Sequence, residues 1–229
     1  NNGDMEAAID WLRKKGLAAA AKKSGRAAAE GLVGILVDGK KAVALEVNSE
    51  TDFVSRNEHF QCFVDTATKL ALNAGDNLDT LLSTSYPGTD RSVQEELTHL
   101  ISVIGENMNI RRLASISVNN GVIANYVHTA TTSTLGRIGV LVAMESTGNA
   151  DELMACGKQI AMHIAAANPQ SCTVEELDPA VVDREREIFA DQARASGKPE
   201  EFIGKMIEGR LRKFYEESVL CEQVFLIDD

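Results

Sequence analysis

The chain has 229 residues, and 34 Asp and Glu against 23 Lys and Arg give it a formal net charge of −11 at pH 7. Its hydrophobic fraction of 44% and charged fraction of 25% are ordinary for one or two globular domains, and they exclude a disordered or collagen-like chain. The sequence contains no run of about 18 consecutive apolar residues, so no membrane-spanning helix is predicted. The acidic balance disfavours direct nucleic-acid binding, which needs clustered Lys and Arg.

The chain opens with a short predicted helix. Asn1–Asp4 is typical of a turn, with Asp4 as the N-cap of a helix from Met5 to about Lys15. Residues 17–30 are rich in Ala, Lys and Arg and favour a linker over a core element. We expect both ends of the chain to be cuts through a longer protein.

A β-hairpin and a helix follow. Residues 32–37 and 41–47 are rich in strand-forming residues, and the pair Asp38-Gly39 between them is a strong hairpin signal. After a polar connector, apolar residues at helical spacing predict a helix over 52–72. Residues 73–91 contain Gly and Pro and favour a loop, and residues 92–104 have the period of a second helix.

The same order of elements then recurs. Strands are predicted over 109–118 and 121–128, on either side of a turn at 119–121. A polar loop over 129–137, a strand over 138–144 and a helix over 150–167 follow. The order of elements over 121–167 repeats that over 31–72, with a longer hairpin loop between the strands 121–128 and 138–144. This repeated hairpin plus helix predicts an α+β fold with two related lobes, each an antiparallel sheet covered by helices.

A helical hairpin is inserted near the C-terminus. Its first helix is predicted over 179–195, and Ser196-Gly197-Lys198-Pro199 supplies a glycine helix end and a proline helix start. Two stripes of apolar residues follow the helical period in this segment. The predicted domains are thus a first lobe over 27–120, a second lobe over 121–178 with a final strand within 218–229, and a helical hairpin over 179–217.

Chemistry-bearing motifs are absent. No GxxxxGK[ST], no GxGxxG after a strand, no HExxH and no GxSxG occurs. His59, His99, His128 and His163 are far apart in the sequence, and His99 and His163 are expected as packing or surface residues. We therefore predict no catalytic residue, no metal site and no cofactor. An enzyme of unknown class, assembled from distant residues, is the alternative.

The four cysteines, Cys62, Cys156, Cys172 and Cys221, form neither a CxxC pair nor a zinc pattern. Cys62 and Cys156 fall inside helical apolar patterns, so core packing is expected for both. A chain of this size needs no disulfide framework, and a reducing compartment fits this cysteine usage better.

The connector over 48–57 is the most unusual stretch. It has a Phe at the tip between a strand and a helix, and Thr51 is predicted to cap that helix through its hydroxyl. Two interpretations of Phe53 are open. It either folds back into its own lobe as a hydrophobic staple, or it stays exposed as a wedge for a partner's pocket.

This connector resembles a motif of the elongation factor Ts family. The stretch NSETDFVSRNEHF is similar to that family's TDFV motif, and IGENMNIRR at 104–112 is similar to its IGEN-NIRR segment. GRIGVLV at 136–142 resembles its second-lobe strand, and SGKPEEFIGKMIEGRLRKF at 196–214 resembles its helical-hairpin module. The opening over 1–16 resembles the last helix of its small N-terminal domain, to which residues 1–26 are assigned with their linker.

The resemblance implies a guanine-nucleotide exchange factor, not an enzyme, that binds elongation factor Tu in its GDP-bound and nucleotide-free states. Asp52 and Phe53 would press on the partner's nucleotide domain and disturb Mg²⁺ and phosphate binding. Ile104 and Gly105 would contact the same helices. The implied partner-binding residues are Thr51, Asp52, Phe53, Val54, Ile104, Gly105, His128, Leu226 and Ile227.

The chain departs from the family's pattern in places. The family's N-terminal TGAG-type segment and its closing strands are missing, and Leu226-Ile227 stand where an apolar pair would be. The stretch YVHTATTSTLGRIG is longer than usual, which affects the placement of His128. Two further expectations follow: a homodimer through the helical hairpin, and a cytoplasmic or organelle-matrix location. A binding or dimerisation homologue without exchange activity is the alternative function.

Overall fold

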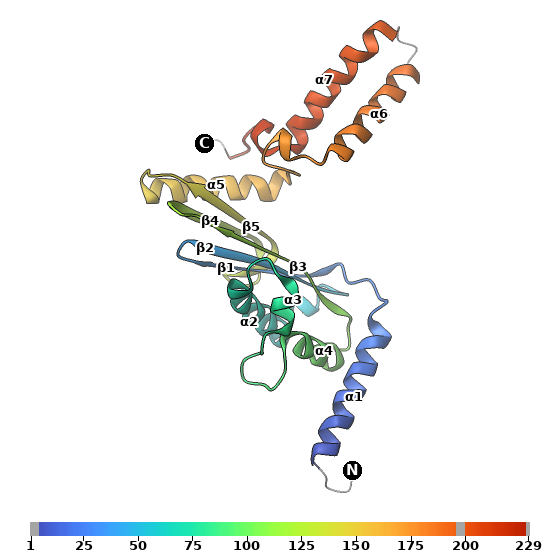
Figure 1. Cartoon of the computed structure of the whole chain (residues 1–229), viewed down its shortest axis with the longest axis vertical. Coiled ribbons are helices and arrows are strands. Elements are labelled where there is room, and N and C mark those ends of the chain that lie inside the picture. Colours follow the sequence, from blue (N-terminus) through green and yellow to red (C-terminus); the bar gives the residue numbers. More distant parts are fainter. Residues whose placement is uncertain (1–4, 196–199, 228–229) are drawn as a thin grey trace. The chain divides into compact units, whose positions relative to one another are not determined.

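The computed structural model describes residues 5–195 and 200–227, which contain seven α-helices and five strands (Figure 1). The chain divides into two compact units, Asn1–Ala161 and Met162–Asp229. Among the described helices, none combines the length and the apolar character that crossing a bilayer requires. The α+β fold class is confirmed.

The first unit is built around one antiparallel sheet with the strand order β3-β2-β1-β5-β4. Its strands are β1 (Glu30–Asp38), β2 (Lys41–Ser49), β3 (Met108–Ser117), β4 (Gly121–Ala130) and β5 (Leu135–Glu145). The two predicted hairpins are present as β1–β2 and β4–β5. The first hairpin turns at residues 39–40, one residue later than predicted, and Gly39 has a φ of +57°.

Two separate lobes with a sheet each are not confirmed. β5 joins β1 through the pairs Val33–Gly136 and Gly34–Leu135, so the strands of both predicted lobes belong to one sheet. Beyond this short junction, β5 crosses a face of β1. A Cβ added at Gly139 would lie 2.7 Å from side-chain atoms of both Val33 and Ile35, so glycine permits this close crossing.

The hairpin β4–β5 therefore covers one face of the β1–β2–β3 sheet. A small apolar cluster of Ala42, Val118 and Ile123 is buried there. Figure 1 shows α2, α3 and α4 on the other face. In α5 (Ala150–Ala167), which matches the predicted helix over 150–167, Gly157 lies against Ala124 of β4.

The main core lies between the sheet and the helices α2 (Glu58–Ala74), α3 (Leu78–Ser83) and α4 (Val93–Ile104). Burial of apolar surface from both layers drives this packing. The fully or almost fully buried side chains include Leu32, Val43, Leu45, Val47, Phe60, Phe63, Val64, Leu81, Val93 and Leu97.

Local details of these helices differ from the predictions. α2 begins at Glu58 because Asn57 caps it, with its side chain accepting hydrogen bonds from the amides of His59 and Phe60. The predicted capping by Thr51 is wrong. The predicted loop over 73–91 contains α3, whose N-cap is Asn77.

The helix α1 (Met5–Lys23) is longer than predicted and includes residues assigned to a linker. Its end is fixed on α4, since the Lys23 ammonium donates to the Ile101 carbonyl at 3.1 Å. A cation at the last carbonyls of a helix is favourable for α4. The predicted turn over residues 1–4 lies outside the described residues.

The second unit contains the predicted helical hairpin, α6 (Pro179–Ala195) and α7 (Glu200–Ser218). Ala193, Ile203 and Leu211 are buried in it. The predicted turn over residues 196–199 lies outside the described residues. The predicted final strand is wrong: in residues 218–227, Ser218 ends α7 and Val219 makes only an isolated bridge with Ser171. A 3₁₀ helix at Leu220–Glu222 and an irregular segment follow.

All four cysteines are exposed, so the core packing predicted for Cys62 and Cys156 is wrong. The physical reason for Cys62 is its position on the helix. The buried residues of α2 recur at 60, 63, 64, 67, 68 and 71, and residue 62 falls on the opposite side of that stripe.

Candidate functional site

The connector between β2 and α2 exposes Phe53 on a fixed base. The Phe53 side chain is 73% exposed, whereas the next residue, Val54, is 4% exposed and belongs to the main core. Val54 begins a single turn of 3₁₀ helix, Val54–Arg56. The alternative in which Phe53 folds back as a staple is therefore wrong, and the neighbouring valine is the buried anchor.

Short-range hydrogen bonds fix this turn. The amides of Ser55, Arg56 and Asn57 donate to the carbonyls of Asp52, Phe53 and Val54 at 3.2, 3.1 and 2.9 Å. The Ser55 hydroxyl also donates to the Gly31 carbonyl on β1 at 3.1 Å. Asp52 is exposed beside Phe53. The turn thus presents an acidic and an aromatic side chain together at a fixed place on the sheet.

The predicted contacts Ile104 and Gly105 lie at the C-terminus of α4. Gly105 has a φ of +91° and ends the helix, with its amide donating to the Ile101 carbonyl at 3.0 Å. Glycine adopts this left-handed conformation without the steric strain that a side chain causes. Ile104 is half-buried against the main core, and the side chain of Val103 is 59% exposed.

Two carboxylates that were not among the predicted contacts, Glu106 and Glu50, join these two predicted segments. The Glu106 carboxylate accepts hydrogen bonds from the Thr51 amide at 3.0 Å and from the Thr51 hydroxyl at 2.7 Å. The Glu50 carboxylate accepts from the Asn107 amide at 2.5 Å. Thr51–Val54 and Ile104–Gly105 therefore form one continuous region of the first unit.

His128 lies elsewhere in the first unit, on the edge strand β4. It is exposed, and its Nδ1 atom is 3.0 Å from the Tyr126 hydroxyl on the same strand. Within the part of the chain that the structure describes, no hydrogen bond or ion pair joins it to the Thr51–Val54 segment. The loop expected over 129–137 is shorter than predicted, since β4 ends at Ala130 and β5 begins at Leu135.

Leu226 and Ile227 lie at the end of the second unit. Leu226 is 59% exposed, and its amide donates to Nδ1 of the buried His163 at 3.2 Å. Nδ1 accepts this bond, so the proton of the neutral ring is on Nε2, which is 3.0 Å from Oε1 of Gln223. The Phe225 ring lies 5.4 Å from the His163 ring. His163, expected as a packing or surface residue, also fixes the backbone of this segment.

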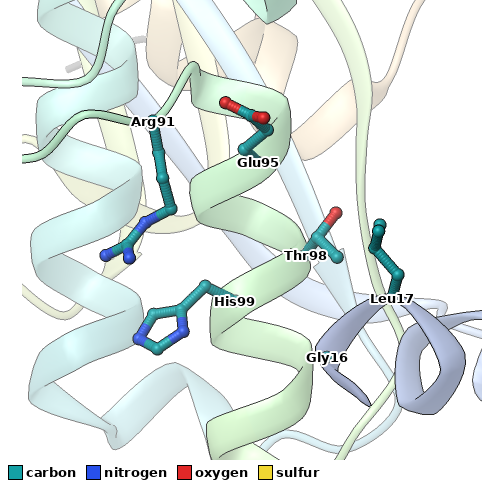
Figure 2. A pocket seen from close by; sticks show the side chains of 6 residues that line it. All are labelled: Gly16, Leu17, Arg91, Glu95, Thr98 and His99. Carbon is teal, nitrogen blue, oxygen red and sulfur yellow. The ribbon is translucent and has the colours of Figure 1, made fainter. Parts of the chain in front are cut away.

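A pocket of about 90 Å³ between α1 and α4 is a possible ligand site elsewhere in the first unit (Figure 2). Sites for drug-sized ligands enclose roughly 300–1,000 Å³, so this pocket is too small for a nucleotide. It is lined by Gly16, Leu17, Arg91, Glu95, Thr98 and His99.

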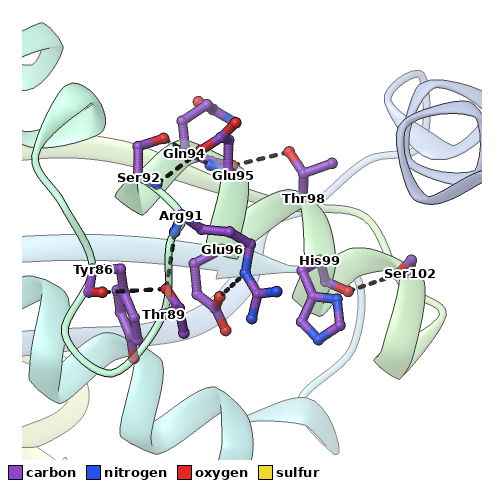
Figure 3. A network of polar contacts seen from close by, with 10 residues as sticks. All are labelled: Tyr86, Thr89, Arg91, Ser92, Gln94, Glu95, Glu96, Thr98, His99 and Ser102. Atoms are coloured by element: carbon purple, nitrogen blue, oxygen red, sulfur yellow. Dashed lines mark hydrogen bonds and ion pairs between the residues drawn. The ribbon is translucent and has the colours of Figure 1, made fainter. Parts of the chain in front are cut away.

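The polar side chains around this pocket stabilise α4 (Figure 3). Ser92 and Glu95 form a capping box, in which the Glu95 amide donates to the Ser92 hydroxyl and the Ser92 amide donates to the Glu95 carboxylate. Arg91 forms an ion pair with Glu96. These bonds account for Arg91 and Glu95 as parts of a helix N-terminus.

Metal ligands do not converge in the described residues, where no three His, Cys, Asp or Glu side chains are grouped in a way that could hold an ion. Among the groups with a shifted pKa, Glu46 of β2 lies closest in sequence to the connector. Burial raises its pKa, but hydrogen bonds from Asn48 and Arg112 outweigh burial and hold the pKa of this carboxyl below its ordinary value.

The family model and the similar curated proteins agree on one family. A family model described as elongation factor TS matches residues 50–229. A protein of Rhodospirillum centenum is 60% identical over 227 residues, which cover 99% of this chain and 74% of that protein. Proteins of Paramagnetospirillum magneticum and Rhizobium etli are 59% and 53% identical, over 99% of this chain and 72% and 74% of their own lengths. All three relatives are named elongation factor Ts.

Proposed function

Because the chain belongs to the elongation factor Ts family, we propose that it binds elongation factor Tu·GDP through the turn at residues 52–57, the Phe53 turn, and promotes GDP release. The family consists of guanine-nucleotide exchange factors that act on elongation factor Tu in protein biosynthesis. The chain is an elongation factor of this kind. What we propose is which residues of the chain contact the partner and how they promote GDP release.

The observation that carries the proposal is the exposed Phe53 beside the buried Val54. Exposed fractions of 73% and 4% at adjacent positions leave an aromatic ring in water while its base is fixed in the core. Aromatic anchors that fill a partner's pocket dominate the energetics of many interfaces. A backbone held in this way loses little conformational freedom on binding, which favours affinity.

In the proposed mechanism, Phe53 inserts between helices of the partner's nucleotide domain, and Asp52 presses on the same domain. This shifts partner elements that hold Mg²⁺ and the phosphates of GDP. An exchange factor must bind the nucleotide-free partner more tightly than the GDP-bound one, and GDP must weaken its binding by the same ratio. No bond is made or broken, so the proposal requires no catalytic residue and the chain is not an enzyme.

The free energy gained by burying one Phe side chain limits how much Phe53 alone can destabilise bound GDP. Burying one Phe side chain contributes roughly 1.5–3 kcal/mol, which is one to two decades of affinity. Loss of Mg²⁺ coordination in the partner must supply the rest of the destabilisation of bound GDP.

The remaining proposed contacts are on both units. In the first unit they are Thr51, Ile104, Gly105 and His128, and in the second unit they are Leu226 and Ile227. Val54, which the resemblance also implied as a contact, is 4% exposed, so its role in this proposal is that of the buried anchor of the turn. We further propose that the chain acts in the cytoplasm, or in an organelle matrix, where translation takes place. A homodimer through α6 and α7 stays a prediction, and a monomer mass by light scattering at micromolar concentration would contradict it.

The release of fluorescently labelled GDP from elongation factor Tu, measured against increasing chain concentration, tests this function. The wild-type chain is expected to accelerate release, and Phe53→Ala to reduce the acceleration by about 10- to 100-fold. Trp11→Ala is the matched control, because it removes a 48%-exposed aromatic of α1 outside the proposed contacts. Binding of the wild-type chain without acceleration would favour the alternative, a homologue without exchange activity.

A further inference from the structure

Two carboxylates join the connector after β2 to the connector before β3 in a reciprocal arrangement. Glu106 accepts the amide hydrogen of Thr51, the residue after Glu50. Glu50 accepts the amide hydrogen of Asn107, the residue after Glu106. Each connector thus provides one carboxylate and one backbone donor. We refer to Glu50, Thr51, Glu106 and Asn107 as the carboxylate clasp.

The clasp lies where the backbone ladder of the sheet ends. The last pair between β2 and β3 is Ser49–Met108, and the two chains diverge beyond it. The amides of Thr51 and Asn107 therefore have no partner strand. Carboxylates are strong acceptors for such amides, and charge-assisted bonds are about twice as strong as neutral ones.

Further bonds reinforce the clasp. The Thr51 hydroxyl donates to Glu106 at 2.7 Å, so both donors of this residue are used by one carboxylate. The Ser49 hydroxyl donates to the Thr51 carbonyl at 3.0 Å. The side-chain amide of Asn107, which is 8% exposed, donates to the Arg26 carbonyl at 2.7 Å. Hydrogen bonds with Ser49 and with the Arg26 carbonyl thus tie the clasp to residues outside it.

We propose that Glu106 and Glu50 are positioning residues for nucleotide exchange. They hold the Phe53 turn and the end of α4 as one rigid contact surface. This inference rests on the proposed function and goes beyond it, because neither carboxylate is among the proposed contacts. The two carboxylates act through Thr51 and Asn107, whose amides they hold. Without the clasp, the turn must be ordered when the partner binds, and this ordering costs free energy that a preformed surface does not lose.

The test begins with Glu106→Ala, with Glu58→Ala as its matched control. Glu58 is an exposed carboxylate close to the same turn, so the control removes the same charge and leaves the clasp intact. Glu106→Ala is expected to lower the maximal rate of stimulated GDP release, at saturating chain, by about tenfold. Glu58→Ala is expected to change it by less than about twofold.

A double-mutant cycle separates positioning from a general loss of stability. Thr51→Val removes the hydroxyl donor with little change of shape. Combining Thr51→Val with Glu106→Ala is expected to lower the rate by less than the product of the two single effects, because both changes break the same link. Fully multiplicative effects would overturn the coupling. Glu50→Gln provides a second, milder variant should Glu106→Ala fail to fold.

Amide hydrogen exchange gives a readout that does not depend on elongation factor Tu. In Glu106→Ala, the Thr51 amide is expected to lose protection, while amides of the β1–β2 ladder keep theirs. Unchanged protection of Thr51 would overturn the clasp, and lost protection with an unchanged release rate would overturn its role in exchange. If the wild-type chain itself fails to stimulate release, the proposed function fails, and amide exchange alone then decides whether the clasp orders the turn.

Discussion

Two segments of this molecule expose apolar side chains, but they are held by different means. Phe53 lies on a turn that is fixed by the buried Val54, by backbone hydrogen bonds and by two carboxylates at the end of a sheet. Leu226 lies on an irregular segment whose amide is held by a single buried histidine, His163. A contact built on a sheet inherits the stability of the sheet, whereas a contact held by one side chain can loosen without unfolding the rest.

The largest expected effect on the free energy of global unfolding comes from the anchor of the first segment. Val54→Ala removes two buried methyl groups and should lower the free energy of unfolding by about 1.5–2.5 kcal/mol. Urea denaturation measures this change. Val224→Ala is the matched control, because this valine is 81% exposed and its truncation should cost less than about 0.5 kcal/mol. Equal effects of the two variants would show that Val54 is no anchor.

The second segment should respond locally. His163→Leu fills a similar volume but leaves the Leu226 amide and the Gln223 side chain without their histidine partner. Two lost hydrogen bonds predict local destabilisation of about 1–3 kcal/mol. Hydrogen exchange should show faster exchange at residues 223–227 and unchanged protection in β1 and β2.

His99→Leu serves as the control for this change, since His99 is an exposed histidine. Faster exchange throughout the sheet of the His163→Leu variant would contradict the comparison between the two segments.

A smaller effect is expected at the end of α4. Gly105 has a φ of +91°, and nothing lies within 4 Å of a Cβ added there, so Gly105→Ala should cost only backbone strain, about 1 kcal/mol. Gly209→Ala is the control with the opposite sign. It also has open space, and it lies inside α7, so alanine should stabilise that helix by about 0.5–1 kcal/mol. Thermal unfolding of both variants checks these signs.

The smallest effect concerns pH and β2, the strand that leads to the Phe53 turn. The folded-state pKa of Glu46 lies below its ordinary value of 4.5, so its ionised form stabilises the fold above that pH. This contribution is lost as the pH falls from 4.5 through the lower folded-state pKa. Because the group is partly exposed, we expect no more than about 0.5 kcal/mol.

Denaturation of Glu46→Gln at pH 7 and again below the folded-state pKa measures this contribution. The variant should be less stable than the wild type at pH 7, and the difference should shrink in acid. A difference that grows on acidification would reverse the assigned sign.

The sequence predicted elements wherever one local pattern was enough. The β1–β2 and β4–β5 hairpins, α4, α5 and the helical hairpin follow from turn residues and hydrophobic periods. Short or non-local features were missed. α3 has only six residues, and the junction of β5 with β1 depends on pairing between residues about 100 positions apart.

The candidate site shows the same limit. The sequence marks the motif around Phe53, but it does not distinguish an exposed Phe53 from a staple, because the difference depends on whether Phe53 or Val54 fills the core. Glu106 and His163 act through partners 55 and 63 positions away, so no local pattern marks them. Glu106 belongs to the IGEN stretch, but nothing in the sequence pairs its carboxylate with Thr51.

The most direct test of the wedge is the ratio of two affinities. Titration calorimetry would measure binding of the wild-type chain and of Phe53→Ala to nucleotide-free and to GDP-bound elongation factor Tu. A wedge predicts that Phe53→Ala weakens binding to the nucleotide-free partner more than binding to the GDP-bound partner, so that the ratio falls by about tenfold or more. Equal weakening of both complexes would contradict it, because Phe53 would then contribute affinity without driving GDP release.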